Sequence, residues 1–308
     1  MSFDTPILLI VFNRPEKTQK LFDIIKKLKP KKLFVAADGP RDKETDIYNC
    51  REVRKIFDDI EFNCDIHKRF NIKNDGLKKN VKNSIDWFFS KVEKGIILED
   101  DCMPSLSFFN FCQELLDRYE KNEKIMQING TNLGIDYSKK VKETYFFSKL
   151  NHVWGWASWR RAWNKFDHDF SNFLENESKN YIKEYYENDQ IYEWMKVYFE
   201  KAIDKTDNIW STYWSYSIFK NDGICITPVK NLVQNIGFDG SGTSGKSEIF
   251  KEFSDTKIHE LSIIVHPKKP FFDINNDRYM FEKKIKKIDP RASILKKIKE
   301  KIKKFFNG

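Results

Sequence analysis

Short apolar runs alternate with segments of helical periodicity over the first 130 residues. Residues 7–12 and 95–98 are apolar runs, as expected of strands buried on both faces of a sheet. Between them, Leu21, Ile25 and Leu28 recur at a spacing that predicts a helix with one apolar face. This order of elements predicts an α/β fold with a mainly parallel sheet flanked by helices. Further strands are expected at 32–37, 62–67 and 125–128, and further helices around 53–57, 81–88 and 108–119.

The pattern changes beyond residue 130, where aromatic and acidic residues become frequent. We predict one main domain over residues 1–245, whose halves are 1–130 and 131–245. Residues 246–282 are expected to form a linker or extension. Residues 283–308 are expected to form a basic tail.

Polar residues directly follow three of the predicted strands. Asn13 and Arg14 come after the first strand, Asp38 after the second, and residues 99–101 after the fourth. Ligands of doubly wound α/β sheets bind beyond the carboxyl ends of the strands. We therefore expect these side chains to share one rim of the sheet.

The acidic triplet Glu99, Asp100 and Asp101 is the clearest candidate for a metal site. Carboxylates crowded at the end of an apolar strand repel one another unless a cation is present. Mn²⁺ and Mg²⁺ take oxygen ligands, commonly one or two carboxylates together with phosphate oxygens. A metal there would neutralise and orient a diphosphate leaving group. The alternative is a solvated acidic loop.

Five blocks of sequence together resemble a known enzyme superfamily. They are, in chain order, Asn-Arg-Pro, Ala-Ala-Asp-Gly-Pro, Gly-Ile-Ile-Leu-Glu-Asp-Asp-Cys-Met-Pro-Ser, Val-Trp-Gly-Trp-Ala-Ser-Trp-Arg-Arg-Ala-Trp and Asn-Leu-Val-Gln-Asn-Ile-Gly-Phe. Through these blocks, residues 5–240 resemble bacterial nucleotide-diphospho-sugar transferases of the GT-A superfamily. More distantly, they are similar to animal N-acetylglucosaminyltransferase I.

The resemblance implies a Rossmann-like GT-A fold and an enzyme activity of the hexosyltransferase type. The chain would move a sugar from a nucleotide-diphosphate donor, with a UDP-sugar favoured, to a glycan or glycoconjugate acceptor. The transfer would be metal-dependent and inverting, and it would serve polysaccharide biosynthesis.

The resemblance also implies roles for single residues. Asp101 would bind Mn²⁺ or Mg²⁺. At the start of the helix around 81–88, Lys79 would approach the nucleotide, and Lys78 or Asn80 could take this role instead. Arginine suits bidentate contact with phosphate, and a carboxylate accepts hydrogen bonds from hydroxyl and imide groups. Taken without the resemblance, Arg14 could form a surface ion pair and Asp38 could be a turn residue. The residues expected to bind the nucleotide sugar are Asn13, Arg14, Asp38, Lys79, Glu99 and Asp100.

Tryptophans supply the candidates for contact with the acceptor or the sugar. Trp154 and Trp156 flank a glycine on a predicted loop, where an indole ring can pack on the C–H face of a sugar. Trp214, in a second aromatic block, is the third candidate. Trp159 and Trp163 are expected on one face of the following helix, within the core.

The catalytic base is the unassigned part of the predicted mechanism. An inverting transfer needs a group that deprotonates the acceptor hydroxyl. Relatives often carry an Asp where this chain has Ser211, and a hydroxyl cannot take that proton unaided. Asp207, Asp222 and Asp239 remain as candidates, and their spacing does not choose among them.

Residues 240–247 read Gly-Ser-Gly-Thr-Ser-Gly-Lys-Ser, which matches the pattern of an NTPase P-loop. In that function Lys246 would bind the β- and γ-phosphates. A P-loop normally opens a parallel sheet, whereas this segment comes late and no apolar strand ending in Asp follows it. We interpret it as a flexible loop that closes over the site, with an NTPase as the alternative function.

The positive charge of the chain is concentrated near its carboxyl terminus. The chain of 308 residues has a net charge of +9, and residues 283–304 hold eleven Lys and Arg against two acids. The body is therefore neutral on balance, and nucleic acid is not an expected partner. Residues 289–306 gather Ile, Leu and Phe on one stripe, which predicts a basic amphipathic helix on an anionic membrane surface. Alternatively, this helix docks onto the body of the chain or onto a partner. An alternative function for the whole chain is that of a non-catalytic protein that binds nucleic acid or anionic surfaces through this tail.

Cysteine usage and the amino-terminal sequence bear on the compartment. The five cysteines form no C-x-x-C pair, which favours a reducing environment. No basic stretch followed by an apolar run is present near the start. We expect a cytoplasmic protein, peripheral at the inner face of the cell membrane.

Overall fold

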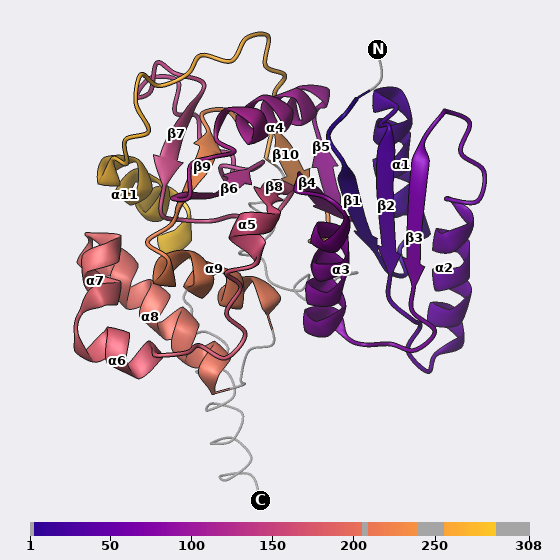
Figure 1. Cartoon of the computed structure of the whole chain (residues 1–308), viewed down its shortest axis with the longest axis horizontal. Coiled ribbons are helices and arrows are strands. Elements are labelled where there is room, and N and C mark those ends of the chain that lie inside the picture. Colours follow the sequence, from indigo (N-terminus) through magenta and orange to yellow (C-terminus); the bar gives the residue numbers. More distant parts are fainter. Residues whose placement is uncertain (1–2, 205–208, 240–255, 288–308) are drawn as a thin grey trace, which may run out of the picture.

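The computed structural model describes residues 3–204, 209–239 and 256–287. At its centre is an eight-stranded sheet in the order β3-β2-β1-β4-β8-β6-β9-β7, beside a two-stranded sheet of β10 and β5 (Figure 1). The strands are β1 (Ile7–Val11), β2 (Lys32–Ala37), β3 (Asp65–Phe70), β4 (Lys94–Glu99), β5 (Cys102–Pro104), β6 (Ile125–Asn129), β7 (Tyr145–Ser148), β8 (Trp156–Trp159), β9 (Ile224–Pro228) and β10 (Val233–Asn235).

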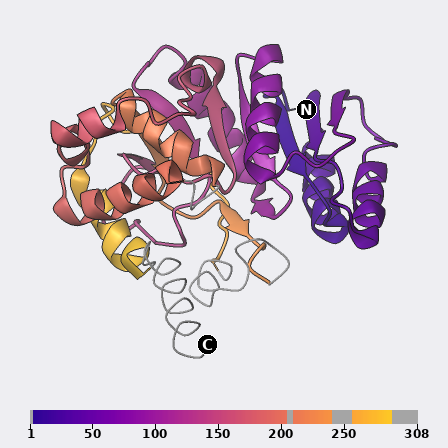
Figure 2. The same cartoon turned by 90° about the horizontal axis from the view of Figure 1, so that it is seen from below.

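Helices cover both faces of the large sheet, and further helices gather beyond its β7 end (Figures 1 and 2). None of the described helices is long and apolar enough to cross a bilayer. The helices are α1 (Pro15–Leu28), α2 (Glu44–Lys55), α3 (Leu77–Lys91), α4 (Leu106–Arg118), α5 (Arg160–Trp163), α6 (Phe173–Ser178), α7 (Tyr181–Tyr186), α8 (Asp189–Ile203), α9 (Trp210–Lys220) and α11 (Ile274–Lys283), followed by a 3-10 turn at Ile285–Lys287.

Alternation along the strands distributes the core over the two faces. Leu9 of β1 packs with α1, α2 and α4, whereas its neighbours Leu8 and Ile10 pack with α3, α5 and α9. Successive side chains of a strand point to opposite faces of the sheet, and helices cover both faces, so both sets are buried. This explains why the predicted strands are apolar at every position rather than at every second one.

The predicted α/β class, with a mostly parallel sheet between helices, is confirmed. Strands β2, β1 and β4 pair in parallel. Two strands run against the rest: β8 is antiparallel to β4 and β6, and β7 is antiparallel to β9. The sheet is therefore mixed in its second half.

One local prediction is wrong and one strand was not predicted. Trp159, expected in a helix, is the last residue of strand β8, and the helix α5 begins only at Arg160. Residues 102–104 form the unpredicted strand β5, because they pair with β10. In both places pairing with a distant strand decides the conformation, which local spacing cannot show.

A second hydrophobic core lies between α6–α9, α11 and β7. Helix α11 falls within residues 246–282, expected as a linker or extension, and it packs into this core through Met280 and Phe281. Its Asp277 accepts hydrogen bonds from Ser148 Oγ at 2.6 Å and from the backbone N–H of Lys149 at 2.8 Å. The described part of that segment is thus an integral extension of the second half.

Candidate functional site

The carboxyl ends of β1, β2 and β4 lie side by side and form the predicted rim. In the pairing of β1 with β4, Ile10 stands opposite Glu99, and the N–H of Asp100 donates to Ile10 O at 3.1 Å. Because β8 is antiparallel to β4, the segment that enters β8, with Trp154, lies at the same edge. The rim therefore gathers Arg14, the acidic triplet and Trp154.

Arg14 bridges two carboxylates of the triplet. Its Nη1 lies 2.9 Å from Asp100 Oδ1 and 2.9 Å from Asp101 Oδ2. Desolvation, followed by repulsion from Asp101 and Asp100, raises the pKa of Glu99, and Arg14 opposes this rise. Desolvation also raises the pKa of Asp100. The cluster is therefore short of positive charge even with the guanidinium in place.

A loop that follows β10 closes on Asp101. The N–H of Ile236 donates to Asp101 O at 2.8 Å, and Asn235 Nδ2 lies 3.4 Å from Asp101 Oδ1. A Cβ on Gly237 would lie 2.3 Å from Asp101 Oδ2, so a side chain there would displace the carboxylate. Asn235 and Gly237 were not among the predicted site residues, although both belong to the last block of the resemblance.

The residues around Asp101 fit a metal site shared with a diphosphate rather than one made of protein ligands alone. Within residues 3–204, 209–239 and 256–287, no group of three or more His, Cys, Asp and Glu is arranged to hold an ion. An all-protein cage is therefore not present in that part of the chain. Mn²⁺ and Mg²⁺ can be held by one or two carboxylates together with diphosphate oxygens, and Asp101 suits that mode.

Lys17 and Asp239 lie beside this cluster, and Lys17 was not predicted. Lys17 stands in the first helical turn after Arg14, and its Nζ lies 2.9 Å from Asp239. The ring of Phe238 packs edge-on against Trp154, with 5.3 Å between the ring centroids. Asp239 is thus a candidate base near the rim. The i, i+3 spacing of Arg14 and Lys17 is the signal that could have identified Lys17.

Asp222 lies at the opposite edge of the sheet, so it cannot serve as the base for a reaction at this rim. It directly precedes β9 and forms an ion pair with Lys124, which precedes β6. Strands β6 and β9 are parallel, and β6 runs in the direction of β4. Asp222 therefore lies at the amino ends of the strands, whereas the acidic triplet lies at a carboxyl end.

Trp156 and Trp214 are core residues, and the prediction that they contact an acceptor is wrong. Their exposed fractions are 1% and 0%, and their ring centroids lie 6.0 Å apart. Trp214 Nε1 donates to Gln127 Oε1 at 2.6 Å. Trp154, by contrast, is only partly buried and lies at the rim, where its ring packs against Phe238.

The carboxylate of Asp38 is engaged by its own chain, as expected of a turn residue, and its place in the nucleotide-sugar site stays a prediction. The residue is 4% exposed. Its carboxylate accepts hydrogen bonds from backbone N–H groups and side-chain amides of the turn that leads to α3. The donors are Gly39 N, Asp75 N, Gly76 N, Asn71 Nδ2 and Asn74 Nδ2, at 2.9–3.2 Å.

The two other residues predicted to bind the nucleotide sugar have partners outside the triplet. Asn13 Nδ2 donates to Asp46 Oδ1 of α2 at 2.6 Å. Lys79 is exposed and forms an ion pair with Asp75 at 2.7 Å. The structure thus brings together Arg14, Glu99, Asp100 and Asp101, and leaves Asn13 and Lys79 at the margin.

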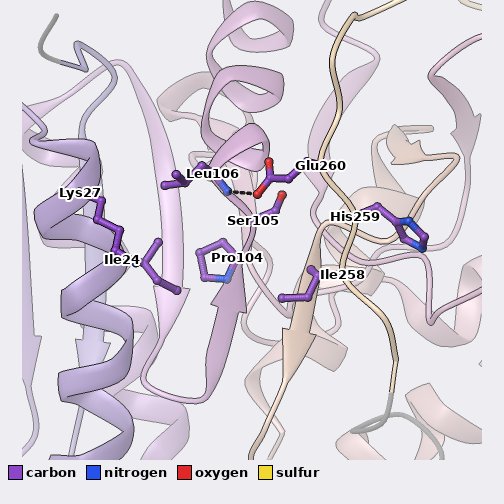
Figure 3. A pocket seen from close by; sticks show the side chains of 8 residues that line it. All are labelled: Ile24, Lys27, Pro104, Ser105, Leu106, Ile258, His259 and Glu260. Carbon is purple, nitrogen blue, oxygen red and sulfur yellow. Dashed lines mark hydrogen bonds between the residues drawn. The ribbon is translucent and has the colours of Figure 1, made fainter.

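A pocket of about 320 Å³ opens on the other side of β5 and is not part of the rim. Figure 3 shows Ile24 and Lys27 of α1 on one side, His259 on the other and Pro104 between them. The backbone N–H groups at the amino end of α4 could bind an anion in this pocket, but Glu260 already occupies them. Its carboxylate accepts hydrogen bonds from Leu106 N at 3.0 Å and Ser107 N at 2.8 Å. We assign no ligand to it.

Three predictions fall outside the described residues. They concern Asp207 as a candidate base, residues 240–247 as a loop or P-loop, and residues 289–306 as an amphipathic helix. They stay predictions.

Comparison with known proteins adds little to this geometry. No protein-family model and no curated protein sequence matches the chain. Among solved structures, mouse xyloside xylosyltransferase 1 is similar over 83% of this chain and 95% of its own, with 10% identity and a TM-score of 0.33. HddC from Yersinia pseudotuberculosis is similar over 51% of this chain and 77% of its own, with 8% identity and a TM-score of 0.31. Likeness at this level supports no conclusion about activity.

Proposed function

We propose that this chain is a glycosyltransferase that binds a nucleotide-diphosphate sugar, with a UDP-sugar favoured, at the rim formed by Arg14 and residues 99–101. The observation that supports this is the bridge from Arg14 to Asp100 and Asp101, at the carboxyl ends of two adjacent parallel strands. Ligands of α/β sheets bind at such edges. A carboxylate cluster short of positive charge is suited to a divalent cation.

Asp101 would hold Mn²⁺ or Mg²⁺ in this proposal. When bound, the ion supplies positive charge that stabilises the departing diphosphate. Arg14 contributes a guanidinium next to the same position, which suits contact with phosphate oxygens. Gly237 and Asn235 hold the Asp101 carboxylate in place.

The acceptor side is proposed to lie near Trp154 and Asp239. Trp154 offers an indole face at the rim, and Asp239 offers a carboxylate that is 54% exposed. An inverting transfer to a glycan or glycoconjugate needs one such base. The proposal that the acceptor is reached at the inner face of the membrane rests on the sequence of residues 289–306 alone.

The test is calorimetric titration of a panel of nucleotide sugars, with and without Mn²⁺, into the wild-type protein and Asp101→Asn. We expect Mn²⁺-dependent binding of a UDP-sugar that Asp101→Asn abolishes. Asp117→Asn is the matched control, because Asp117 is exposed and pairs with Lys94 at the amino end of β4. Equal donor binding by Asp101→Asn and wild type, or no binding by wild type, would overturn the proposal.

A further inference from the structure

The ion pair between Lys17 and Asp239 connects α1 to the segment that closes on Asp101. Lys17 Nζ lies 2.9 Å from each of the two carboxylate oxygens of Asp239. The Lys17 side chain is nearly enclosed, with 11% exposed, whereas 54% of the Asp239 side chain is exposed. The ammonium group of Lys17 therefore belongs to a largely buried side chain, whereas its partner Asp239 lies at the surface.

Lys17 lies in the first turn of α1, three residues after Arg14, which caps the amino end of this helix. Arg14 bonds to Asp100 and Asp101, and Lys17 pairs with Asp239, two residues after the Gly237 that packs against Asp101. The amino end of α1 adds partial positive charge in the same region.

The Asp239 carboxylate thus occupies a place where positive charge converges. It presents two oxygens to an ammonium group, as a diphosphate would. The backbone leads Asp239 there from Gly237, which is packed against Asp101. A ligand phosphate held next to Asp101 would therefore compete with Asp239 for the same ammonium.

We propose that Lys17 is a second diphosphate-binding residue and that Asp239 occupies it until the donor binds. This inference rests on the proposed function. Donor binding releases the Asp239 carboxylate, which then takes the proton of the acceptor hydroxyl. The acceptor oxygen forms the new bond to the anomeric carbon as the bond from that carbon to the diphosphate breaks, and the diphosphate leaves with the electron pair. Donor binding therefore precedes productive binding of the acceptor.

The experiment is titration of UDP and UMP, each with Mn²⁺, into wild type, Lys17→Met, Asp239→Asn and the double variant. Loss of a charged hydrogen bond should weaken UDP binding by Lys17→Met about ten- to a hundredfold. UMP binding should change less, because UMP lacks the second phosphate. Asp239→Asn should bind UDP more tightly than wild type, and the double variant should bind it like Lys17→Met.

Lys20→Met is the matched control, because Lys20 lies on the same helix and is exposed. It should bind UDP like wild type. Thermal unfolding shows that each variant is folded, and Asp239→Asn tests the competition even if Lys17→Met is unstable. If wild type binds UDP while Asp239→Asn binds it equally or more weakly, the inference is overturned and the proposed function stands. If wild type binds no nucleotide, the proposed function itself is overturned.

Discussion

The Nη1 atom of Arg14 lies 2.9 Å from Oδ2 of Asp101, the carboxylate proposed to hold a metal. The same atom lies 2.9 Å from Asp100 Oδ1, so one guanidinium serves two consecutive acids. All three side chains are largely buried, with 22%, 8% and 18% of Arg14, Asp100 and Asp101 exposed. Arg14 therefore offsets part of the negative charge at this rim, and a change in one partner should affect both stability and ligand binding.

Replacing Arg14 by Met should lower the free energy of unfolding by about 3 kcal/mol, because it leaves buried carboxylates without their counterion. Urea denaturation measures this loss. Mn²⁺ should raise the melting temperature of Arg14→Met more than that of wild type, since the ion can neutralise the same carboxylates. Arg51→Met, at an exposed position of α2, is the control. An equal response to Mn²⁺ in Arg14→Met and wild type would contradict this.

Replacing Asp38 by Asn should destabilise the turn at residues 71–76. The new amide group would face donors that now bond to a carboxylate, at a cost of about 1–3 kcal/mol. Hydrogen exchange should show faster exchange of the Asp75 and Gly76 amides, whose acceptor is Asp38. Asp58→Asn, at an exposed position, should leave these amides unchanged. Unchanged protection in Asp38→Asn would show that the turn does not depend on Asp38.

Replacing Trp214 by Phe should cost about 2 kcal/mol of stability, because it leaves Gln127 Oε1 buried without its donor. Thermal or urea unfolding measures the effect. Trp154→Phe is the matched comparison and should cost less, since Trp154 lies at the rim. A larger loss from Trp154→Phe than from Trp214→Phe would contradict the assignment of Trp214 to the core.

Asp277 should make stability depend on pH. Burial raises the pKa of Asp277 to about 7, against the hydrogen bonds from Ser148 and Lys149 that lower it. The ordinary pKa of an Asp side chain is 3.8, so between about pH 4 and 7 the folded state keeps a proton that the unfolded chain releases. Stability contributed through this group therefore falls as pH rises through that window.

The variant Asp277→Asn removes this dependence. Its melting temperature relative to wild type should rise between pH 4.5 and pH 7.5, as measured by calorimetry. Glu282→Gln, on the exposed side of the same helix, controls for substitution in α11. A difference between Asp277→Asn and wild type that is constant over this range would show that Asp277 does not titrate in this window.

Part of the site could be predicted because it depends on neighbouring residues in the chain. The apolar runs predict β1 and β4 as buried strands, and the polar residues that follow them mark their carboxyl ends. Parallel strands align these ends at one edge, which brings Arg14 to the acidic triplet. The same reasoning failed for Trp156, because a tryptophan next to a glycine reads equally well as a loop residue or as the start of a strand.

Local pattern, then, established the order of strands and helices, the α/β class and the rim, since periodicity and strand ends are properties of consecutive residues. Tertiary structure alone decided which side chains are buried and which partners they have. Asp101 meets Asn235 across 134 residues of chain, and Lys17 meets Asp239 across 222. Such contacts depend on how strands such as β5 and β10 pair in space, and hydrophobic periodicity carries no information about that pairing.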